Sequence, residues 1–258
     1  MASILDRYGI KEVADVTFYK LDSNGNPTTP VLYLDTLKVS TIEQTAENTS
    51  ARGGKGNPEL IMWDYGKEIT LTLEDALFSA KSMALMYGVS IDNTKEFGSL
   101  TSLLKTVKVS EVKIVTESGA TKFYFVVNGK DVPATGVKFY DAEGDEEAVS
   151  GTTVPANAVY ATGNISITGQ QIVISSDNFP GTYYVTGDTF ARNENSGEDE
   201  FFQFIVPKAK MQSEVTLTME AEGDPSTFNM TMKVLRPANG EMMKLVKYDV
   251  NTTAPASN

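Results

Sequence analysis

Alternation of apolar and polar residues, with a period of two, dominates the first part of the chain. In "VADVTFYKL" (13–21), Ala14, Val16 and Phe18 fall on one face and the intervening residues on the other. The segment "EITLTLE" (68–74) repeats this pattern. A period of two is typical of strands that bury one face of an antiparallel sheet.

One segment has the period of a helix instead. In "SAKSMALMYG" (79–88), the apolar residues at spacings of three and four are Ala80, Met83, Ala84 and Tyr87. This spacing predicts a helix with one apolar stripe. Ser79 is suited to cap its N-terminus and Gly88 to end it.

The texture changes after this helix. Residues 91–181 contain short alternating runs broken by Gly, Asn, Asp and Pro, which indicates a compact all-β subdomain. We therefore predict an N-terminal half of a β core (1–90), this inserted subdomain, a C-terminal half (182–250) that includes a strand over 213–223, and a loose polar tail (251–258). The predicted fold is mainly β, with two packed antiparallel sheets in a sandwich or half-barrel, one flanking α-helix and the inserted all-β subdomain.

Composition excludes several kinds of chemistry. The chain has no cysteine and no histidine, so disulfides, thiolate nucleophiles and imidazole bases or ligands are absent. The formal net charge is −12, which disfavours a clamp for nucleic acid phosphates. The same charge suits a surface that DNA passes without adhering. The sequence gives no candidate catalytic residue, metal ligand or cofactor site.

A glycine-rich basic stretch, "NTSARGGKGNPELIMWDY" (48–65), first suggests a phosphate-binding loop. A P-loop requires a Ser or Thr directly after its lysine and a helix behind it, and neither follows Lys55. We interpret the stretch as an arm that contacts a neighbouring subunit, where Arg52 and Lys55 would meet carboxylates. The expected interface residues are Glu47, Arg52, Gly53, Gly54, Lys55, Gly56 and Asn57.

Two acidic clusters, "DAEGDEE" (141–147) and "SGEDE" (196–200), do not match a calcium-binding EF-hand loop. We expect both to be solvated turns. A catalytic pair of Asp and Glu from distant parts of the chain stays open as an alternative, because such partners need not be close in sequence.

The apolar residues Met242, Met243, Leu245, Val246 and Trp63 have two possible places. They belong either to the core or to subunit interfaces, which resemble a core cut in half. The sequence does not decide between these places.

The order of elements resembles that of the tail-tube family of tailed bacteriophages and contractile injection systems. The resemblance covers residues 14–88 and 187–237, about half of the chain, and rests on pattern: strand, turn, long strand, Gly-rich loop, strand, helix, then more strands. In that family, subunits form rings of typically six copies. The rings stack into a tube through which DNA passes during infection, and a long loop between early strands contacts neighbours. Here that loop would span Thr45 to Glu59.

The resemblance implies a structural virion protein of the tail, not an enzyme, that assembles in the cytoplasm of a host bacterium. It also implies contacts with sheath, baseplate and terminator proteins, and DNA only as passing cargo. The N-terminus lacks the features of a signal peptide and no apolar run is long enough to span a membrane, so we expect no membrane anchor. The alternatives are a capsid decoration or a receptor- or glycan-binding β module.

Overall fold

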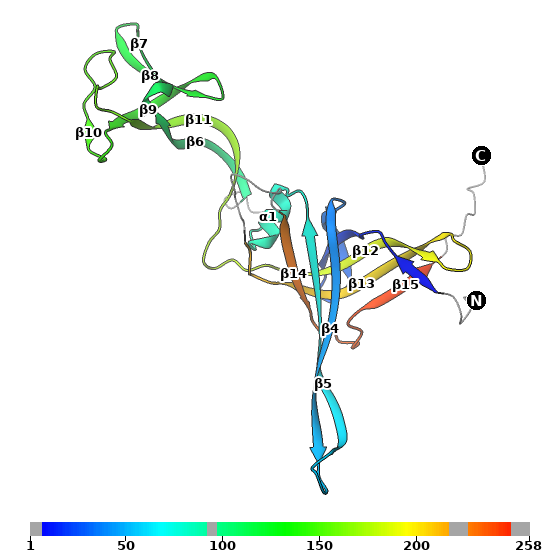
Figure 1. Cartoon of the computed structure of the whole chain (residues 1–258). Coiled ribbons are helices and arrows are strands. Elements are labelled where there is room, and N and C mark those ends of the chain that lie inside the picture. Colours follow the sequence, from blue (N-terminus) through cyan, green and yellow to red (C-terminus); the bar gives the residue numbers. More distant parts are fainter. Residues whose placement is uncertain (1–6, 92–96, 217–226, 249–258) are drawn as a thin grey trace, which may run out of the picture. The chain divides into compact units, whose positions relative to one another are not determined.

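The computed structural model describes residues 7–91, 97–216 and 227–248 (Figure 1). The chain divides into two compact units, one made of residues 1–91 and 174–258 and the other of residues 92–173. Most of the strand predicted over 213–223 and the whole predicted tail lie outside the described residues.

Unit 1 contains a nine-stranded sheet in which every pairing is antiparallel. Its strands are β1 (Tyr8–Ile10), β2 (Asp15–Leu21), β3 (Pro27–Leu34), β4 (Leu37–Arg52), β5 (Glu59–Asp75), β12 (Thr182–Asn193), β13 (Asp199–Met211), β14 (Phe228–Val234) and β15 (Lys244–Tyr248). Their order is β3-β2-β12-β13-β14-β5-β4, with β1 beside β12 and β15 beside β13. Strands from both ends of the chain therefore share one sheet.

The alternating residues make the core of unit 1, as their period predicts. Val16 and Phe18 in β2 and Leu71 and Leu73 in β5 are fully buried. The same cluster takes residues from the C-terminal half, among them Val185, Val206, Met230 and Met232. The burial of alternate residues places one face of the sheet against the core.

The single α-helix in the described part of the chain, α1 (Ala80–Met86), packs Leu85 and Met86 into this core. Ser79 caps its N-terminus, since its Oγ accepts a hydrogen bond from the Ser82 amide at 3.0 Å. Gly88 follows at φ +73°, and a Cβ there would lie 2.3 Å from the carbonyl carbon of Phe179. The predicted helix, its cap and its glycine stop are therefore present. The predicted stripe is not the buried face: the buried residues are Ser82, Ala84, Leu85 and Met86, so only Ala84 of the stripe is among them.

Unit 2 has its own sheet and core. The strands are β6 (Phe97–Lys108), β7 (Val112–Glu117), β8 (Ala120–Val127), β9 (Lys130–Tyr140), β10 (Glu146–Glu147) and β11 (Tyr160–Ile172), with a 3₁₀ turn, η1 (Val109–Glu111). The order is β6-β11-β9-β8-β7, and β10 pairs with β9. Phe125, Phe139 and Ala161 form the buried centre of the unit.

The predicted fold class is confirmed: the described residues are mainly β, with two antiparallel sheets and one α-helix. Each unit contains one of the two sheets. Among the described residues, neither strand order closes into a barrel.

Candidate functional site

The most unusual feature of unit 1 is the hairpin of β4 and β5, whose distal half leaves the sheet and projects from it (Figure 1). β14 pairs with β5 only along residues 70–75, so the second edge of β5 has no partner strand in the described structure along residues 59–67. β4 is the last strand of the sheet order and has no second partner strand among the residues that the structure describes. We call residues 46–67 the arm.

A β-bulge marks the base of the arm. Thr45 pairs with Glu68, but Glu47 pairs with Tyr65, so β5 has one extra residue at this point. Gly66, within the bulge, has φ +62°, a conformation that glycine adopts without strain. A bulge bends the strand and increases its twist, which fits the departure of the arm from the sheet.

The tip of the arm is a tight glycine turn. Gly54, Gly56 and Asn57 have positive φ, and the Asn57 amide donates to the Gly54 carbonyl at 3.1 Å. The predicted loop over Thr45–Glu59 is shorter in the structure, where strand pairing continues to Arg52 and resumes at Glu59. Cross-strand pairs between β-branched and aromatic side chains, such as Thr49 opposite Trp63, favour this extension of the strands.

Side chains at the end of the arm hold each other in place. Arg52 forms an ion pair with Glu59, and the Ser50 hydroxyl donates to the same carboxylate at 3.2 Å. Within the isolated chain, Arg52 thus already has a carboxylate partner. Lys55 is exposed at the tip and forms no ion pair within the described residues.

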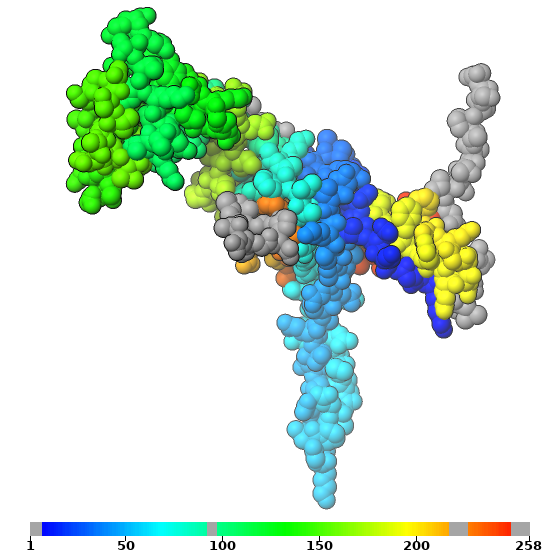
Figure 2. Space-filling model, turned by 45° about the horizontal axis from the view of Figure 1, so that its top comes forward, coloured from blue at the N-terminus to red at the C-terminus, as the bar shows by residue number. Residues whose placement is uncertain are grey.

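The arm exposes a run of large apolar side chains. Leu60, Ile61, Met62, Trp63 and Tyr65 are 52–63% exposed. Register places Ile61, Trp63 and Tyr65 on one face, opposite Ala51, Thr49 and Glu47, and places Leu60, Met62 and Asp64 on the other. Figure 2 shows the arm free of packing neighbours along its shaft. A strand with apolar residues on both faces is normally covered on both, so this run is typical of a surface that becomes buried on association.

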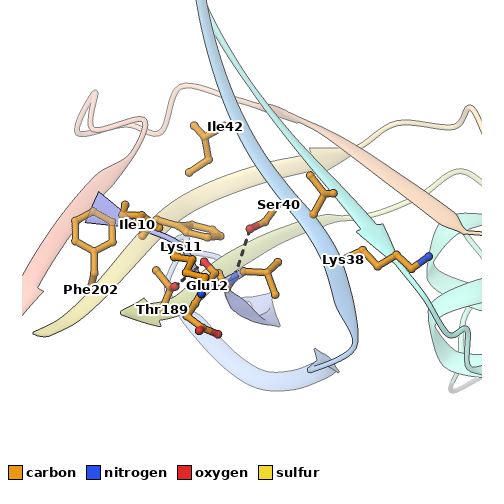
Figure 3. Close-up of a pocket in the computed structure, with 12 residues that line it drawn as sticks. Ile10, Lys11, Glu12, Lys38, Ser40, Ile42, Thr189 and Phe202 are labelled. Carbon is orange, nitrogen blue, oxygen red and sulfur yellow. Dashed lines mark hydrogen bonds between the residues drawn. The ribbon is translucent and has the colours of Figure 1, made fainter. Parts of the chain in front are cut away.

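A hollow of about 360 Å³ lies in unit 1 beside the root of β4 (Figure 3). Its floor is formed by Thr189, Phe202 and Phe204 of β12 and β13. Its walls are the segment 10–14 and the β4 residues 38–42, which are joined by a hydrogen bond from the Ala14 amide to Ser40 Oγ at 3.4 Å.

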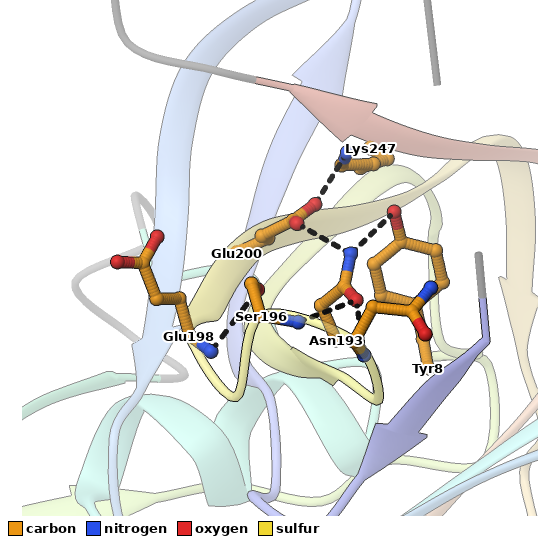
Figure 4. A network of polar contacts seen from close by, with 7 residues as sticks. Tyr8, Asn193, Ser196, Glu198, Glu200 and Lys247 are labelled. Carbon is orange, nitrogen blue, oxygen red and sulfur yellow. Dashed lines mark hydrogen bonds and ion pairs between the residues drawn. The ribbon is translucent and has the colours of Figure 1, made fainter. Parts of the chain in front are cut away.

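A polar network holds the end of the β12–β13 hairpin to its flanking strands (Figure 4). Asn193 Nδ2 donates to Glu200 Oε1 at 3.0 Å and to the Tyr8 hydroxyl at 3.3 Å, and Lys247 forms an ion pair with Glu200. The Lys247 ammonium lowers the pKa of the Glu200 carboxyl, and Glu200 in turn raises the pKa of Lys247. β1, β12, β13 and β15 meet here, so we assign the network to stability.

Acidic side chains of the described residues form turns rather than a metal site. Within them, no group of three or more acidic side chains is placed to hold a metal ion. In the cluster 141–147, Asp141 Oδ1 instead accepts the amides of Glu143 and Asp145 and closes a turn. No described helix is long and apolar enough to span a membrane.

The sequence-predicted interface residues all lie on the arm. Glu47 is on its shaft, Arg52 ends β4, and the glycines with Lys55 and Asn57 form its tip. The sequence left open whether Trp63 belongs to the core or to an interface, and the run around it, 60–65, is exposed on the arm. This run has five large apolar residues in six positions, a pattern that is visible in the sequence. Of the other undecided residues, Met242 and Met243 pack on the core of unit 1, whereas Leu245 is 57% exposed.

Nearly the whole chain is similar to a known protein family and to a phage tail protein. The model of the YomU/Tube protein family matches residues 8–247. The chain is also 26% identical to a protein named "Tail tube protein" from Bacillus phage SPR, over 96% of this chain and 93% of that protein. These matches confirm the resemblance predicted from the sequence and span both units. The chain therefore belongs to the YomU/Tube protein family.

Proposed function

We propose that this chain is the structural subunit of a phage tail tube and acts by assembling with copies of itself. The family match and the similarity to a tail tube protein support this role. The observation that favours self-assembly is the arm, because its exposed apolar run needs a partner surface. In this role the protein is a structural component rather than an enzyme, and its place is the virion tail.

The finer proposal is that copies form rings, typically of six, which stack into a tube for DNA. Ring formation removes free strand edges, and the sheet of unit 1 has such edges at β3 and β4. The net charge of −12 suits a channel that does not retain DNA. Sheath, baseplate and terminator proteins are the further partners in this proposal, and the host cytoplasm is the place of assembly.

Shortening the arm tests the role in assembly. Residues 46–67 are replaced by Asn-Gly, which joins the paired residues Thr45 and Glu68 through a two-residue hairpin turn. We expect the variant to keep the unfolding midpoint of unit 1, because the removed residues are exposed or half-exposed and none belongs to its buried core. Sedimentation velocity should show assemblies for the unaltered chain and only monomers for the variant. Equal assembly by both would refute the role of the arm.

A further inference from the structure

We propose that the arm of one copy docks, with its Trp63 face, into the hollow beside the root of β4 in a second copy. This inference rests on the proposed function and specifies which surface receives the arm. The Trp63 face consists of Ile61, Trp63 and Tyr65 with Glu47 at its base end.

The hollow has the composition of an unfilled interface. Phe202 and Phe204 give it an apolar floor, and Ile10 and Val39 on its walls are 59% and 43% exposed. Figure 3 shows Ile42 directed toward the same space from β4. Apolar side chains from three separate segments therefore surround one concavity, and those of Ile10 and Val39 are exposed, a setting in which an aromatic anchor binds tightly.

The arm supplies a matching projection. A half-exposed aromatic or large aliphatic side chain offers on the order of 100 Å², so the three apolar residues of the Trp63 face offer roughly 300 Å². A stable interface buries about 800 Å² on each partner, and the Trp63 face supplies an apolar centre for it. Its own hollow is not available to the arm, because the arm projects away from the sheet (Figure 1).

The charges at the two surfaces favour one orientation of the arm. Two lysines, Lys11 and Lys38, and one carboxylate, Glu12, line the hollow, and neither lysine forms an ion pair with a described residue. Glu47, at the base end of the Trp63 face, is likewise exposed, with no ion pair among residues 7–91, 97–216 and 227–248. Docking places the Glu47 carboxylate of one copy near the two unpaired ammonium groups of the next.

The geometry also accounts for propagation. The arm and the hollow are different surfaces of one chain, so their contact is heterologous and leaves a free arm and a free hollow at the two ends of any dimer. A contact of this kind generates closed rings or filaments rather than isolated pairs. β4 contributes both its root to the hollow and its distal half to the arm, so successive copies are linked through one strand.

Disulfide trapping tests the seat directly, because the chain has no cysteine of its own. Thr49→Cys, opposite Trp63, is made in one tagged copy, and Val39→Cys in a second copy with another tag. Under mild oxidation we expect a mixed dimer with at least about tenfold higher yield than with the control Val115→Cys, an exposed residue of unit 2. Assembly without the mixed dimer overturns the docking but not the proposed function. If the chain neither assembles nor forms the mixed dimer, both the docking and the proposed function are overturned.

Reversing the charges of exposed side chains gives an independent test, because such substitutions are expected to leave the fold unchanged. Glu47→Lys alone, or Lys11→Glu with Lys38→Glu, should each raise the concentration needed for assembly by about tenfold. The two sets combined should restore assembly, since attraction returns with reversed sign. The matched control, Lys108→Glu with Lys130→Glu in unit 2, should leave assembly unchanged. Failure of the combined variant to recover, with each set alone folded, contradicts the docking.

Discussion

Gly187 in β12 lies opposite Phe204 of β13, and the ring of Phe204 covers the glycine. A Cβ at Gly187 would stand 2.1 Å from the ring, closer than any real contact. The pair therefore sets the local packing of unit 1 and, because Phe204 also forms the floor of the hollow, the shape of that floor. Sequence pattern alone predicts the strand but not this pairing, since the register is a tertiary property.

Gly187→Ala should destabilise unit 1 by about 1–3 kcal/mol, because the added methyl displaces a buried ring. Chemical denaturation measures the change. Gly9→Ala in β1 is the matched control, since nothing lies within 4 Å of a Cβ there, and it should be close to neutral. Equal effects of the two substitutions would contradict the packing described.

Glu200 makes stability depend on acidity. Its pKa is lowered, first by the hydrogen-bonded Lys247 ammonium, so the folded chain binds the proton less readily than the unfolded chain. The stabilisation is present above the unfolded pKa of about 4.3 and is lost as the pH falls through the lower folded value.

Glu200→Gln should lower the unfolding midpoint at pH 7, and the difference from the unaltered chain should shrink as the pH falls below about 4. Thermal unfolding followed by circular dichroism across this range measures it. Glu198→Gln is the control, because the Glu198 side chain points away from the network (Figure 4). A constant difference at every pH would show that Glu200 does not act through its charge.

At the scale of elements, strands with one buried face could be predicted, because burial imposes their period of two. The ends of the helix could be predicted from Ser79 and Gly88, but its buried face could not, because Leu85 and Met86 lie outside the predicted stripe. The arm was harder to predict. Its shaft has no buried face in the isolated chain, so residues 46–52 show no alternation of apolar and polar residues. The stretch is polar and is equally compatible with a loop. Pairing with β5 makes it a strand, and pairing partners are not visible in a local pattern.

The two halves of β5 should differ in amide exchange. Residues 70–75 pair with β4 on one side and β14 on the other, whereas residues 59–67 pair with β4 alone. About half of the distal amides then have no acceptor strand, and they should exchange faster in the monomer. Hydrogen exchange with mass spectrometry should show this difference, and assembly should slow exchange in the distal half. Uniform exchange along β5 before assembly would contradict the pairing described. Unchanged exchange in the distal half after assembly would contradict the burial of the arm between copies.

At the scale of the whole molecule, the change in texture after the helix predicted an inserted all-β segment near 91–181. The structure separates residues 92–173 as a unit with its own core. The functional surfaces, by contrast, could not be assembled from the sequence. The hollow combines segments 10–14, 38–42 and the β12–β13 hairpin, which only the sheet order brings together.

Unit 2 should be removable. Phe97 and Ile172 are paired at one end of the β6–β11 pair, so the two ends of the unit lie on neighbouring strands and a short Gly-Ser linker can replace residues 92–173. The arm, the hollow and the main core all belong to unit 1. We therefore expect the shortened chain to unfold cooperatively and still assemble, as measured by denaturation and sedimentation velocity. A folded variant that stays monomeric would assign assembly to unit 2.

Negative-stain electron microscopy of the purified full chain, over a range of concentrations, shows whether this chain builds a tube from copies of itself. We expect rings or filaments with a central channel, appearing above a threshold concentration because each contact is heterologous. Monodisperse monomers at every concentration, or closed dimers that do not extend, would contradict this expectation.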